Sequence, residues 1–323
     1  MTLSLVIPVW NDPDGLVRLL KQVVALDIFE QIIVSDDASV PAKTPESLNL
    51  GHLKNHPGLL WLRSDAQRGA GHARNMALRR VTGEHVIFFD SDDLFLPEFA
   101  DLLAEIESLD FDFCIFRHVD SRMRAEGNLA PLTSDDALWK SAGAMTAVPT
   151  ALSLQGAKRL CRISAYPWNK VYRTGFLREA NIRCTEIPVH NDLELHWMSF
   201  MKARRILTSK RVCCEHFVED RGTRLTNRTG AERFEVFQAL EALHDELEHN
   251  PHRLQFLEPF TESYVRLFKW IMDTLEPELR ASFAVKVRQF LLRRMTVPLF
   301  TLIALRNPGL GARINQALAE GLS

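Results

Sequence analysis

The sequence lacks hydrophobic runs of membrane-spanning length and any strong excess of charge. No stretch reaches the roughly 18–20 consecutive apolar residues that cross a bilayer. The formal net charge is −2 over 323 residues, so no overall charge would attract nucleic acid. Internal repeats and low-complexity segments are also missing. With 46% hydrophobic and 25% charged residues, the composition is that of a globular protein with one large domain and an appendage, or with two domains.

Cysteine is scarce and follows no pairing pattern. The sequence contains five cysteines, an odd number, and no CxxC spacing. They are Cys114, Cys161, Cys184, Cys213 and Cys214. The first eight residues have no basic segment before their short apolar run, so they are predicted to form a strand and not a signal peptide. These features predict a reducing cytoplasmic location and no disulfide framework.

Short apolar runs alternate with helical patterns over the first hundred residues. Strands are predicted at 3–9, 31–35, 59–62 and 86–89, with helices after the first and third of them. This order predicts a mostly parallel sheet flanked by helices. Right-handed crossovers place the ends of the first, second and fourth strands on one rim, which would bring Asn11, Asp37 and Asp92 together.

Three carboxylates, Asp90, Asp92 and Asp93, directly follow the fourth predicted strand. A central strand that ends in clustered acids must leave the core there, because unpaired carboxylates are costly to bury. Asp90 and Asp92, one residue apart, can lean toward one point, which suits a hard divalent cation that also holds substrate phosphates. The alternative is a solvated acidic turn that caps the helix predicted from Pro97.

Two glycines, Gly69 and Gly71, open the helix predicted at 69–80. They allow close backbone approach, and free amides at a helix N-terminus favour phosphate. Arg74, one turn into the helix, could reach a diphosphate or pair with the acids. A tight turn is the alternative, but the neighbouring acids favour a phosphate site.

Four motifs stand in order at fitting intervals: LVIPVWN at 5–11, IVSDDAS at 33–39, GAGHARN at 69–75 and FDSDD at 89–93. Together they resemble the nucleotide-binding half of family-2 glycosyltransferases of the GT-A type. The resemblance implies an α/β, Rossmann-like GT-A fold and inverting, metal-dependent hexosyl transfer from a nucleotide-sugar, usually a UDP-sugar. It also implies Mn²⁺ or Mg²⁺ as cofactor.

The resemblance further implies roles for single residues. Asp37 is expected to bind the base and Arg74 to lie near the diphosphate or donor sugar, while Asp90 meets the ribose or metal and Asp92 ligates the metal. The expected donor-binding set is Pro8, Val9, Asn11, Asp37, Arg68, Arg74, Asp90, Ser91, Asp92, Arg221 and Thr223.

Residues 111–228 are expected to form the acceptor half of a catalytic domain over 1–228, with 1–110 as the donor half. A polar loop is predicted over 121–134. The segment 166–173 resembles the one that precedes the general base in bacterial members of the family. Within it, Trp168 fits either sugar stacking or the core, and the alternative for Lys170 is an ordinary surface lysine.

The segment 187–196 carries the expected general base. Family members often have Glu-Asp here on the first turn of a helix, whereas this chain has Asn191-Asp192. Asp192 therefore matches the base, which takes a proton from the acceptor hydroxyl as that oxygen attacks the anomeric carbon. Helix capping is the alternative for Asp192, and Glu194 is a rival carboxylate on a different face of the helix.

A strand is predicted at 211–214, and the residues after it resemble the family's loop over the diphosphate. His216 is the candidate for a further metal ligand, with a histidine packed at a strand end as the alternative. Arg221 and Thr223 are expected to contact phosphate, unless they are solvated loop residues.

The chain is helical in pattern from residue 230 to its end, which predicts a C-terminal α-helical extension over 229–323. Between Glu278 and Glu320 it contains seven basic residues and no acid. A basic amphipathic end of this kind is compatible with peripheral contact with the inner face of the plasma membrane. The alternative is a helix pair that packs on the catalytic domain or forms a homodimer.

The resemblance implies a glycosyltransferase that acts on a glycan or lipid-linked acceptor, and the cysteine pattern predicts that it is cytoplasmic. A nucleotidyltransferase, which would not need Asp192, and a catalytically silent nucleotide-sugar-binding scaffold are the alternatives. No nucleic-acid partner is expected.

Overall fold

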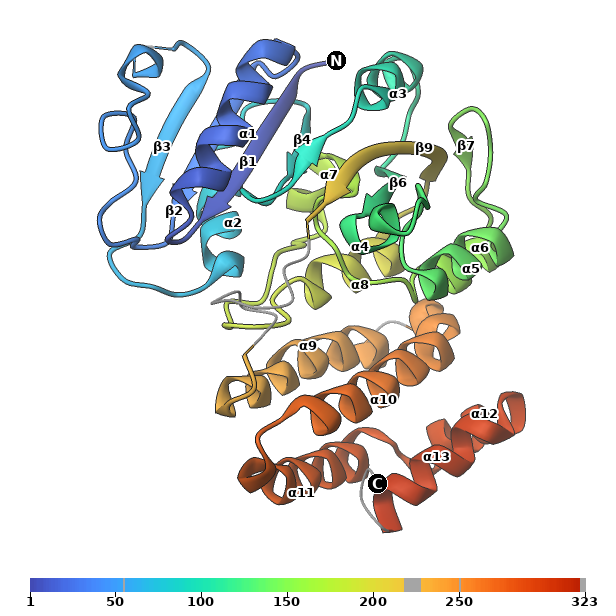
Figure 1. Cartoon of the computed structure of the whole chain (residues 1–323). Helices are drawn as coiled ribbons and strands as arrows, with labels where there is room; N and C mark the ends of the chain where they lie inside the picture. Colours follow the sequence, from blue (N-terminus) through green and yellow to red (C-terminus); the bar gives the residue numbers. More distant parts are fainter. Residues whose placement is uncertain (55, 218–227, 250, 320–323) are drawn as a thin grey trace. The chain divides into compact units, whose positions relative to one another are not determined.

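The computed structural model describes residues 1–54, 56–217, 228–249 and 251–319, and the chain divides into two compact units (Figure 1). The first unit consists of residues 1–186 and 191–220, and the second of residues 187–190 and 221–323.

The first unit is built on one sheet, in which nine strands lie within the described residues. The strands are β1 (Leu3–Val9), β2 (Gln31–Asp36), β3 (Leu59–Arg63), β4 (His85–Phe88), β5 (Leu94–Phe95), β6 (Phe113–Asp120), β7 (Thr150–Ala151), β8 (Lys170–Arg173) and β9 (Ile206–His216). The helices are α1 (Pro13–Leu26), α2 (Ala70–Leu78), α3 (Glu98–Ile106), α4 (Ser121–Ala125), α5 (Thr133–Ser141), α6 (Leu154–Leu160), α7 (Thr174–Glu179) and α8 (Leu193–Lys202), with a 3₁₀ turn at Gly51–Leu53.

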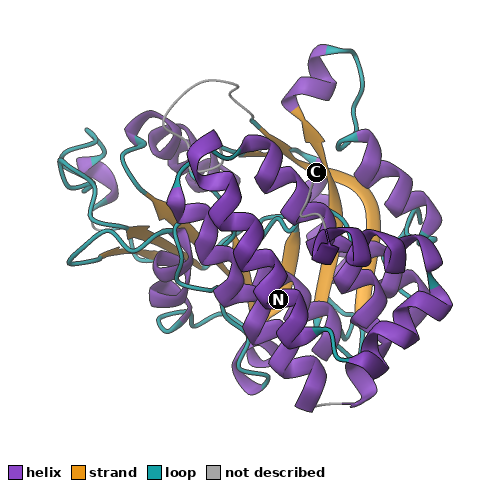
Figure 2. Ribbon diagram, turned by 90° about the horizontal axis from the view of Figure 1, so that it is seen from below, coloured by secondary structure: helices purple, strands orange, loops and turns teal. Residues whose placement is uncertain are grey.

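The strand order is β3-β2-β1-β4-β8-β6-β9-β5, with β7 paired to β9. The first four strands in this order are mutually parallel, so their carboxyl ends share one rim as predicted. Strand β8 then runs antiparallel between β4 and β6, and β6 pairs parallel with β9. The predicted α/β sheet with flanking helices is confirmed, and its second half is mixed (Figure 2).

Helices cover both faces of the parallel half because its strands are apolar on both sides. Leu5 and Ile7 of β1 join Leu16 and other residues of α1 in one core cluster, and Figure 1 shows α1 lying across these strands. On the opposite face, Ser35 of β2 donates through Oγ to the carbonyl oxygen of Ala73 in α2 at 2.8 Å. Helices α1 and α2 therefore pack on opposite faces of the parallel half of the sheet.

The structure differs from the sequence-based expectation at three places. The region 121–134 was expected to be a loop, but it contains α4 and the start of α5, and α4 is capped by Asp120, which accepts from the Arg122 amide at 2.9 Å. The strand expected at 211–214 is the longer β9. The sequence pattern does not predict strand β8, because Lys170, which is buried, interrupts its apolar residues.

The second unit is helical in its described residues, as predicted. Its helices are α9 (Val236–His249), α10 (Leu257–Thr274), α11 (Pro277–Arg294), α12 (Val297–Arg306) and α13 (Pro308–Ala319), with 3₁₀ turns at Ala231–Glu235 and Pro251–Phe256. Aromatic rings from α9, α10 and α11 pack together in its core. The ring centroid of Phe237 lies 5.4 Å from that of Phe268 and 5.5 Å from that of Phe290. Among the helices that the structure describes, none is both long and apolar enough to cross a membrane.

Candidate active site

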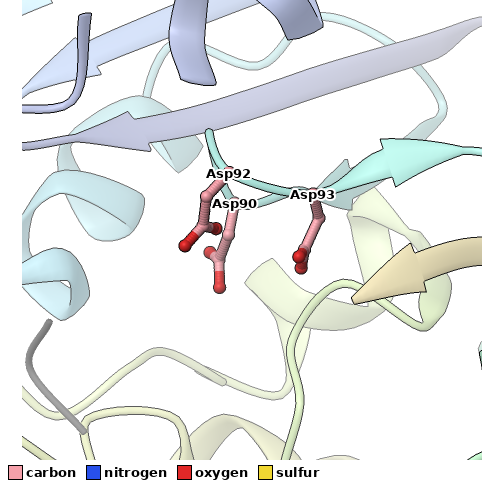
Figure 3. Close-up of side chains that lie close together, drawn as sticks. All are labelled: Asp90, Asp92 and Asp93. Atoms are coloured by element: carbon pink, nitrogen blue, oxygen red, sulfur yellow. The ribbon is translucent and has the colours of Figure 1, made fainter. Parts of the chain in front are cut away.

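Three acids lie together where the chain leaves β4. One carboxylate oxygen from each of Asp90, Asp92 and Asp93 lies within 4.8 Å of the other two. Figure 3 shows the side chains of Asp90 and Asp92 next to each other on one side of the turn, with Asp93 beside them. Helix α3 has no side-chain cap, so these acids do not cap this helix.

The turn that bears the acids is held by α1 and the residue that caps it. The Ser91 hydroxyl donates to Asp12 Oδ2 at 2.7 Å, while Asp12 Oδ1 accepts from the Gly15 amide at 3.1 Å. The Arg18 guanidinium donates to the carbonyl oxygen of Asp92. Ser91 is expected to bind the donor, and its hydroxyl is bonded to Asp12.

The buried Asp93 pairs with the half-buried His216 at the end of β9. His216 Nδ1 lies 3.0 Å from both Asp93 oxygens, and the Phe217 amide donates to Asp93 at 2.9 Å. Burial raises the pKa of Asp93. Burial opposes the charged form of His216, but the acids, led by Asp93, raise the pKa of this histidine overall. His216, the predicted further metal ligand, thus lies beside the acid cluster and is oriented by one of its members.

Arg74 connects the acid cluster to the segment that carries the predicted base. Its side chain is buried, and it donates to Asp90 Oδ1 at 2.6 Å and to Asn191 Oδ1 at 2.7 Å. Burial opposes the charge, yet the fields of Asp90 and Asp192 raise the pKa of Arg74. Asn191 stands where the family often has Glu. Because its amide is neutral, the charge of Arg74 is compensated by Asp90 and Asp192.

Asp192 occupies the N-cap position of α8, but its side chain makes no capping hydrogen bond. The capping interpretation of this carboxylate is therefore wrong. Burial raises the pKa of Asp192 to about 6, and Arg74 opposes this rise. The rival Glu194 accepts a hydrogen bond from Thr185 Oγ1 at 2.8 Å and is buried. Asp192 is thus the carboxylate of this segment that faces Arg74.

Hydrogen bonds tie helix α2 to the chain segment that leads to Asp192. The Asn75 side chain donates to the carbonyl oxygen of Cys184 at 2.9 Å and accepts from the Cys184 amide at 3.0 Å. Glu186 accepts from Arg68 at 2.7 Å and lies 2.9 Å from His72 Nδ1. One helix therefore positions both the acid cluster, through Arg74, and the segment of the predicted base.

The glycines that open α2 serve contacts within the protein. A Cβ on Gly71 would lie 2.2 Å from the carbonyl oxygen of Thr185 and 3.0 Å from Cβ of Asn191. Gly69 has φ of 92°, and its amide donates to Asp37 Oδ2 at 2.7 Å. The close approach predicted from these glycines is therefore real, and the partner that the structure shows is the segment before the base.

The remaining donor-side residues lie on the predicted rim. Pro8 and Val9 are buried in β1. Asn11 has φ of 51°, and its Oδ1 accepts from the Val40 amide at 2.8 Å. Asp37, expected to bind the base, has both carboxylate oxygens on the amides of Arg68 and Gly69. Arg221 and Thr223 lie outside the described residues.

Lys170 is buried, so the interpretation of this residue as an ordinary surface lysine is wrong. Its side chain is fully buried on β8, where Nζ donates to the carbonyl oxygen of Tyr166 and to Asn169 Oδ1. The sequence feature that could have indicated its burial is the aromatic stretch around it, because a lysine within a buried stretch is itself buried. Trp168 is buried and stacks on Tyr166 at 4.4 Å, so it belongs to the core.

Gly71→Ala tests the close approach between α2 and the base segment. We expect the free energy of unfolding to fall by about 1–3 kcal/mol, because the new methyl group meets backbone that cannot move freely. Urea denaturation measures this loss. Gly51→Ala is the matched control, since nothing lies within 4 Å of its Cβ position, and equal stability of the two variants would contradict the interpretation.

Comparison with known proteins gives the class of this fold. The chain superposes over 100% of its length on S. aureus TarS 1–349 in complex with UDP-GlcNAc, which it covers to 89%, with a TM-score of 0.76 and 17% identity. It superposes over 99% on the mannosyltransferase PcManGT from Pyrobaculum calidifontis in complex with GDP-Man and Mn²⁺, covering 86% of that chain, with a TM-score of 0.55 and 18% identity. The fold is therefore the GT-A fold of glycosyltransferases.

Residues 4–145 match the family model described as glycosyl transferase family 2. Chondroitin synthase of Escherichia coli is 27% identical over 129 residues, which make up 39% of this chain and 18% of that protein. The chain thus spans less than a fifth of the length of this curated relative. The family resemblance read from the four N-terminal motifs is confirmed.

Proposed function

We propose that this protein transfers a sugar from a nucleotide-sugar to an acceptor hydroxyl with inversion, and that Asp192 is the general base. The observation that carries the proposal is the bridge made by Arg74 between Asp90 and the residue next to Asp192. It brings the acids after β4 and the predicted base into one constellation within the first unit. The structures with UDP-GlcNAc and GDP-Man support a nucleotide-sugar donor, and we propose a UDP-sugar.

Single displacement needs one base and no enzyme nucleophile. Asp192 takes the proton of the acceptor hydroxyl while that oxygen forms a bond to the anomeric carbon. The bond between the anomeric carbon and the diphosphate oxygen breaks at the same time, and its electron pair leaves with the nucleotide. Arg74 is a buried cation next to this reaction, where fixed positive charge stabilises developing negative charge more strongly than it does in water.

The donor set after β4 fits a divalent cation. Asp90 and Asp92 offer carboxylate oxygens, the ligands that Mg²⁺ and Mn²⁺ prefer. Asp93 is engaged by His216 and the Phe217 amide, and we propose that it orients His216. Asp92 and Asp90, which also pairs with Arg74, are the proposed metal ligands, with His216 as a further one. When bound, the cation would neutralise charge on the leaving diphosphate.

We propose that residues 1–110 bind the donor, residues 111–228 the acceptor, and that residues 229–323 are an accessory extension. The proposed donor contacts include Pro8, Val9, Asn11, Asp37, Arg68, Ser91, Arg221 and Thr223. The proposed acceptor is a glycan or a lipid-linked sugar. Five unpaired, buried thiols fit a reducing compartment and support a cytoplasmic location.

Helix α12 supports a contact surface on the extension. Only Ile303 is buried in this apolar helix, while Val297 and Leu305 are exposed to 79% and 78%. With basic residues nearby in sequence, we propose contact with an anionic lipid surface. Flotation should recover the protein with anionic vesicles and much less of a Val297→Ser, Leu305→Ser variant. A concentration-dependent dimer without flotation would contradict this and favour a second copy.

Turnover of a donor panel tests the proposed function. Purified protein is incubated with UDP- and GDP-linked sugars in Mn²⁺, and release of the nucleoside diphosphate is measured with and without a chelator. The proposal expects release from at least one UDP-sugar that stops when the metal is removed. Release of pyrophosphate from a nucleoside triphosphate would indicate a nucleotidyltransferase, and tight donor binding without turnover would indicate a scaffold.

A further inference from the structure

One face of α1 holds the backbone of the chain that follows β4. Gln22 donates through Nε2 to the carbonyl oxygen of Phe95 at 2.8 Å and accepts from the Phe95 amide at 3.0 Å. One turn earlier on the same face of the helix, the Arg18 guanidinium donates to the carbonyl oxygen of Asp92. All three bonds go to main-chain atoms, so α1 fixes the path of this segment through its backbone.

Arg18 also contacts the second segment that carries a proposed metal ligand. Its guanidinium carbon lies 4.6 Å from the ring centroid of Phe217, which directly follows His216 at the end of β9. A guanidinium at this distance over an aromatic face is attracted by the ring. The Phe217 amide in turn donates to Asp93 Oδ1 at 2.9 Å. One side chain of α1 therefore touches both the turn after β4 and the end of β9.

The proposed ligands come from these two segments, which are far apart in the sequence. Asp90 and Asp92 lie in the turn, and Figure 3 shows their carboxylates on the same side of it. His216 lies at the strand end. A divalent cation binds carboxylate and imidazole ligands only within a narrow range of distances. A cation held by both segments therefore needs a fixed spacing between them.

We propose that Arg18 is a positioning residue for the proposed metal site. It sets the spacing between the turn after β4 and the end of β9, the two segments that carry the proposed ligands. This inference rests on the proposed function, which supplies the metal. Arg18 does not bind the cation itself, because its guanidinium is always positively charged. It acts through the Asp92 carbonyl and the Phe217 ring.

The sign of the effect on metal affinity separates positioning from charge. Removing a positive charge near a cation site reduces electrostatic repulsion, so charge alone predicts that Arg18→Met binds Mn²⁺ more tightly than wild type. Positioning predicts the opposite, because the variant lacks both contacts that hold the two segments. We expect the Kd for Mn²⁺ to rise about tenfold, the lower end of what losing an outer partner of a metal ligand costs.

Electron paramagnetic resonance of unbound Mn²⁺ measures this affinity without turnover. The protein is titrated with Mn²⁺ alone and again with UDP present. Arg18 is exposed, so Arg18→Met should keep the fold, which thermal denaturation checks. Arg18→Lys keeps the charge and one donor, and it should recover part of the affinity.

The outcomes separate this inference from the proposed function. Equal or tighter Mn²⁺ binding in Arg18→Met, next to a wild type that binds the ion, would overturn the inference and leave the proposed function standing. A wild type that binds no Mn²⁺ in either titration would show that the proposed metal site is wrong, and the role of Arg18 with it.

Two further variants of α1 serve as controls. Gln22→Leu removes two hydrogen bonds to Phe95 from the same face of the helix, but the Phe95 ring stays stacked on Phe89 at a centroid distance of 3.8 Å. Lys21→Met removes an exposed positive charge from the same helix. Both controls should bind Mn²⁺ as wild type does. A loss in either that matches the loss in Arg18→Met would contradict a specific role of Arg18.

Hydrogen exchange gives a readout that needs no metal. The Asp93 amide donates to the carbonyl oxygen of Asp90 at 3.2 Å, and the Phe217 amide donates to Asp93. Both amides should exchange faster in Arg18→Met than in wild type, because their bonds lie in the two segments that Arg18 connects. Faster exchange at Asp93 alone would show that Arg18 supports only the turn, and this result would also overturn the inference.

Discussion

Asp192→Asn is expected to lower the rate of sugar transfer by a factor of about 10²–10⁴, the usual contribution of a positioned general base. The substitution keeps the size of the side chain and removes its ability to take a proton. Because the Asp192 side chain makes no capping bond, the fold should tolerate the change. Donor affinity, measured by calorimetry in Mn²⁺, should stay close to the wild-type value, since the base serves the acceptor.

The pH dependence provides a second check on Asp192. Its pKa is raised to about 6 by burial, and only the ionised form accepts a proton. Activity of the wild type should therefore fall as pH drops through about 6, and this limb should be absent from the residual activity of Asp192→Asn. Glu194→Gln is the control and should remain close to wild type. Loss of activity in Glu194→Gln with survival in Asp192→Asn would assign the base to the rival carboxylate.

Arg74→Met is expected to impair both stability and activity. Removing the guanidinium leaves Asp90 without its ion-pair partner and Asn191 without a donor. Breaking a buried pair from one side costs about 3–5 kcal/mol, and we expect about 3 kcal/mol here because the Asp90 side chain is 29% exposed. Activity should fall at least about 100-fold, because the base segment and the acid cluster lose their shared anchor.

The acid limb distinguishes the role of Arg74 from a purely structural one. Arg74 lowers the pKa of Asp192, so the limb of Arg74→Met should move to higher pH. Arg74→Lys keeps the positive charge, but lysine lacks the planar group that donates to both acceptors. In this variant the pH of the acid limb should therefore return closer to the wild-type value than the rate of transfer does. Arg173→Met is the control, because it removes an arginine that pairs with Asp112 at 3.2 Å, at the C-terminal end of β8. A similar shift of the acid limb in this variant would contradict the interpretation.

The parallel half of the sheet could be predicted because its strands are unbroken apolar runs. Strand β1 is buried along its whole length, and the acids after β4 mark where the chain reaches the rim. Strand β8 could not be predicted in the same way. Its lysine reads as a surface residue, because the strands β4 and β6 on either side of β8 come from other parts of the chain.

Pairings within the site were hidden for a similar reason. Asp93 and His216 are 123 residues apart, and nothing local to either residue indicates the other. Gly71 signalled a close approach, but the sequence did not identify Thr185 as the group approached. Residue types therefore predicted which groups carry chemistry, whereas the contacts that orient them required the folded chain.

Helix α2 has hydrogen bonds to the base segment along one side and Arg74 against the acid cluster. It therefore connects the places proposed for the two substrates. We expect a displacement of this helix to change the distance between leaving group and proton acceptor. Variants along α2 should therefore show correlated changes in donor KM and in acceptor reactivity, instead of affecting one substrate alone.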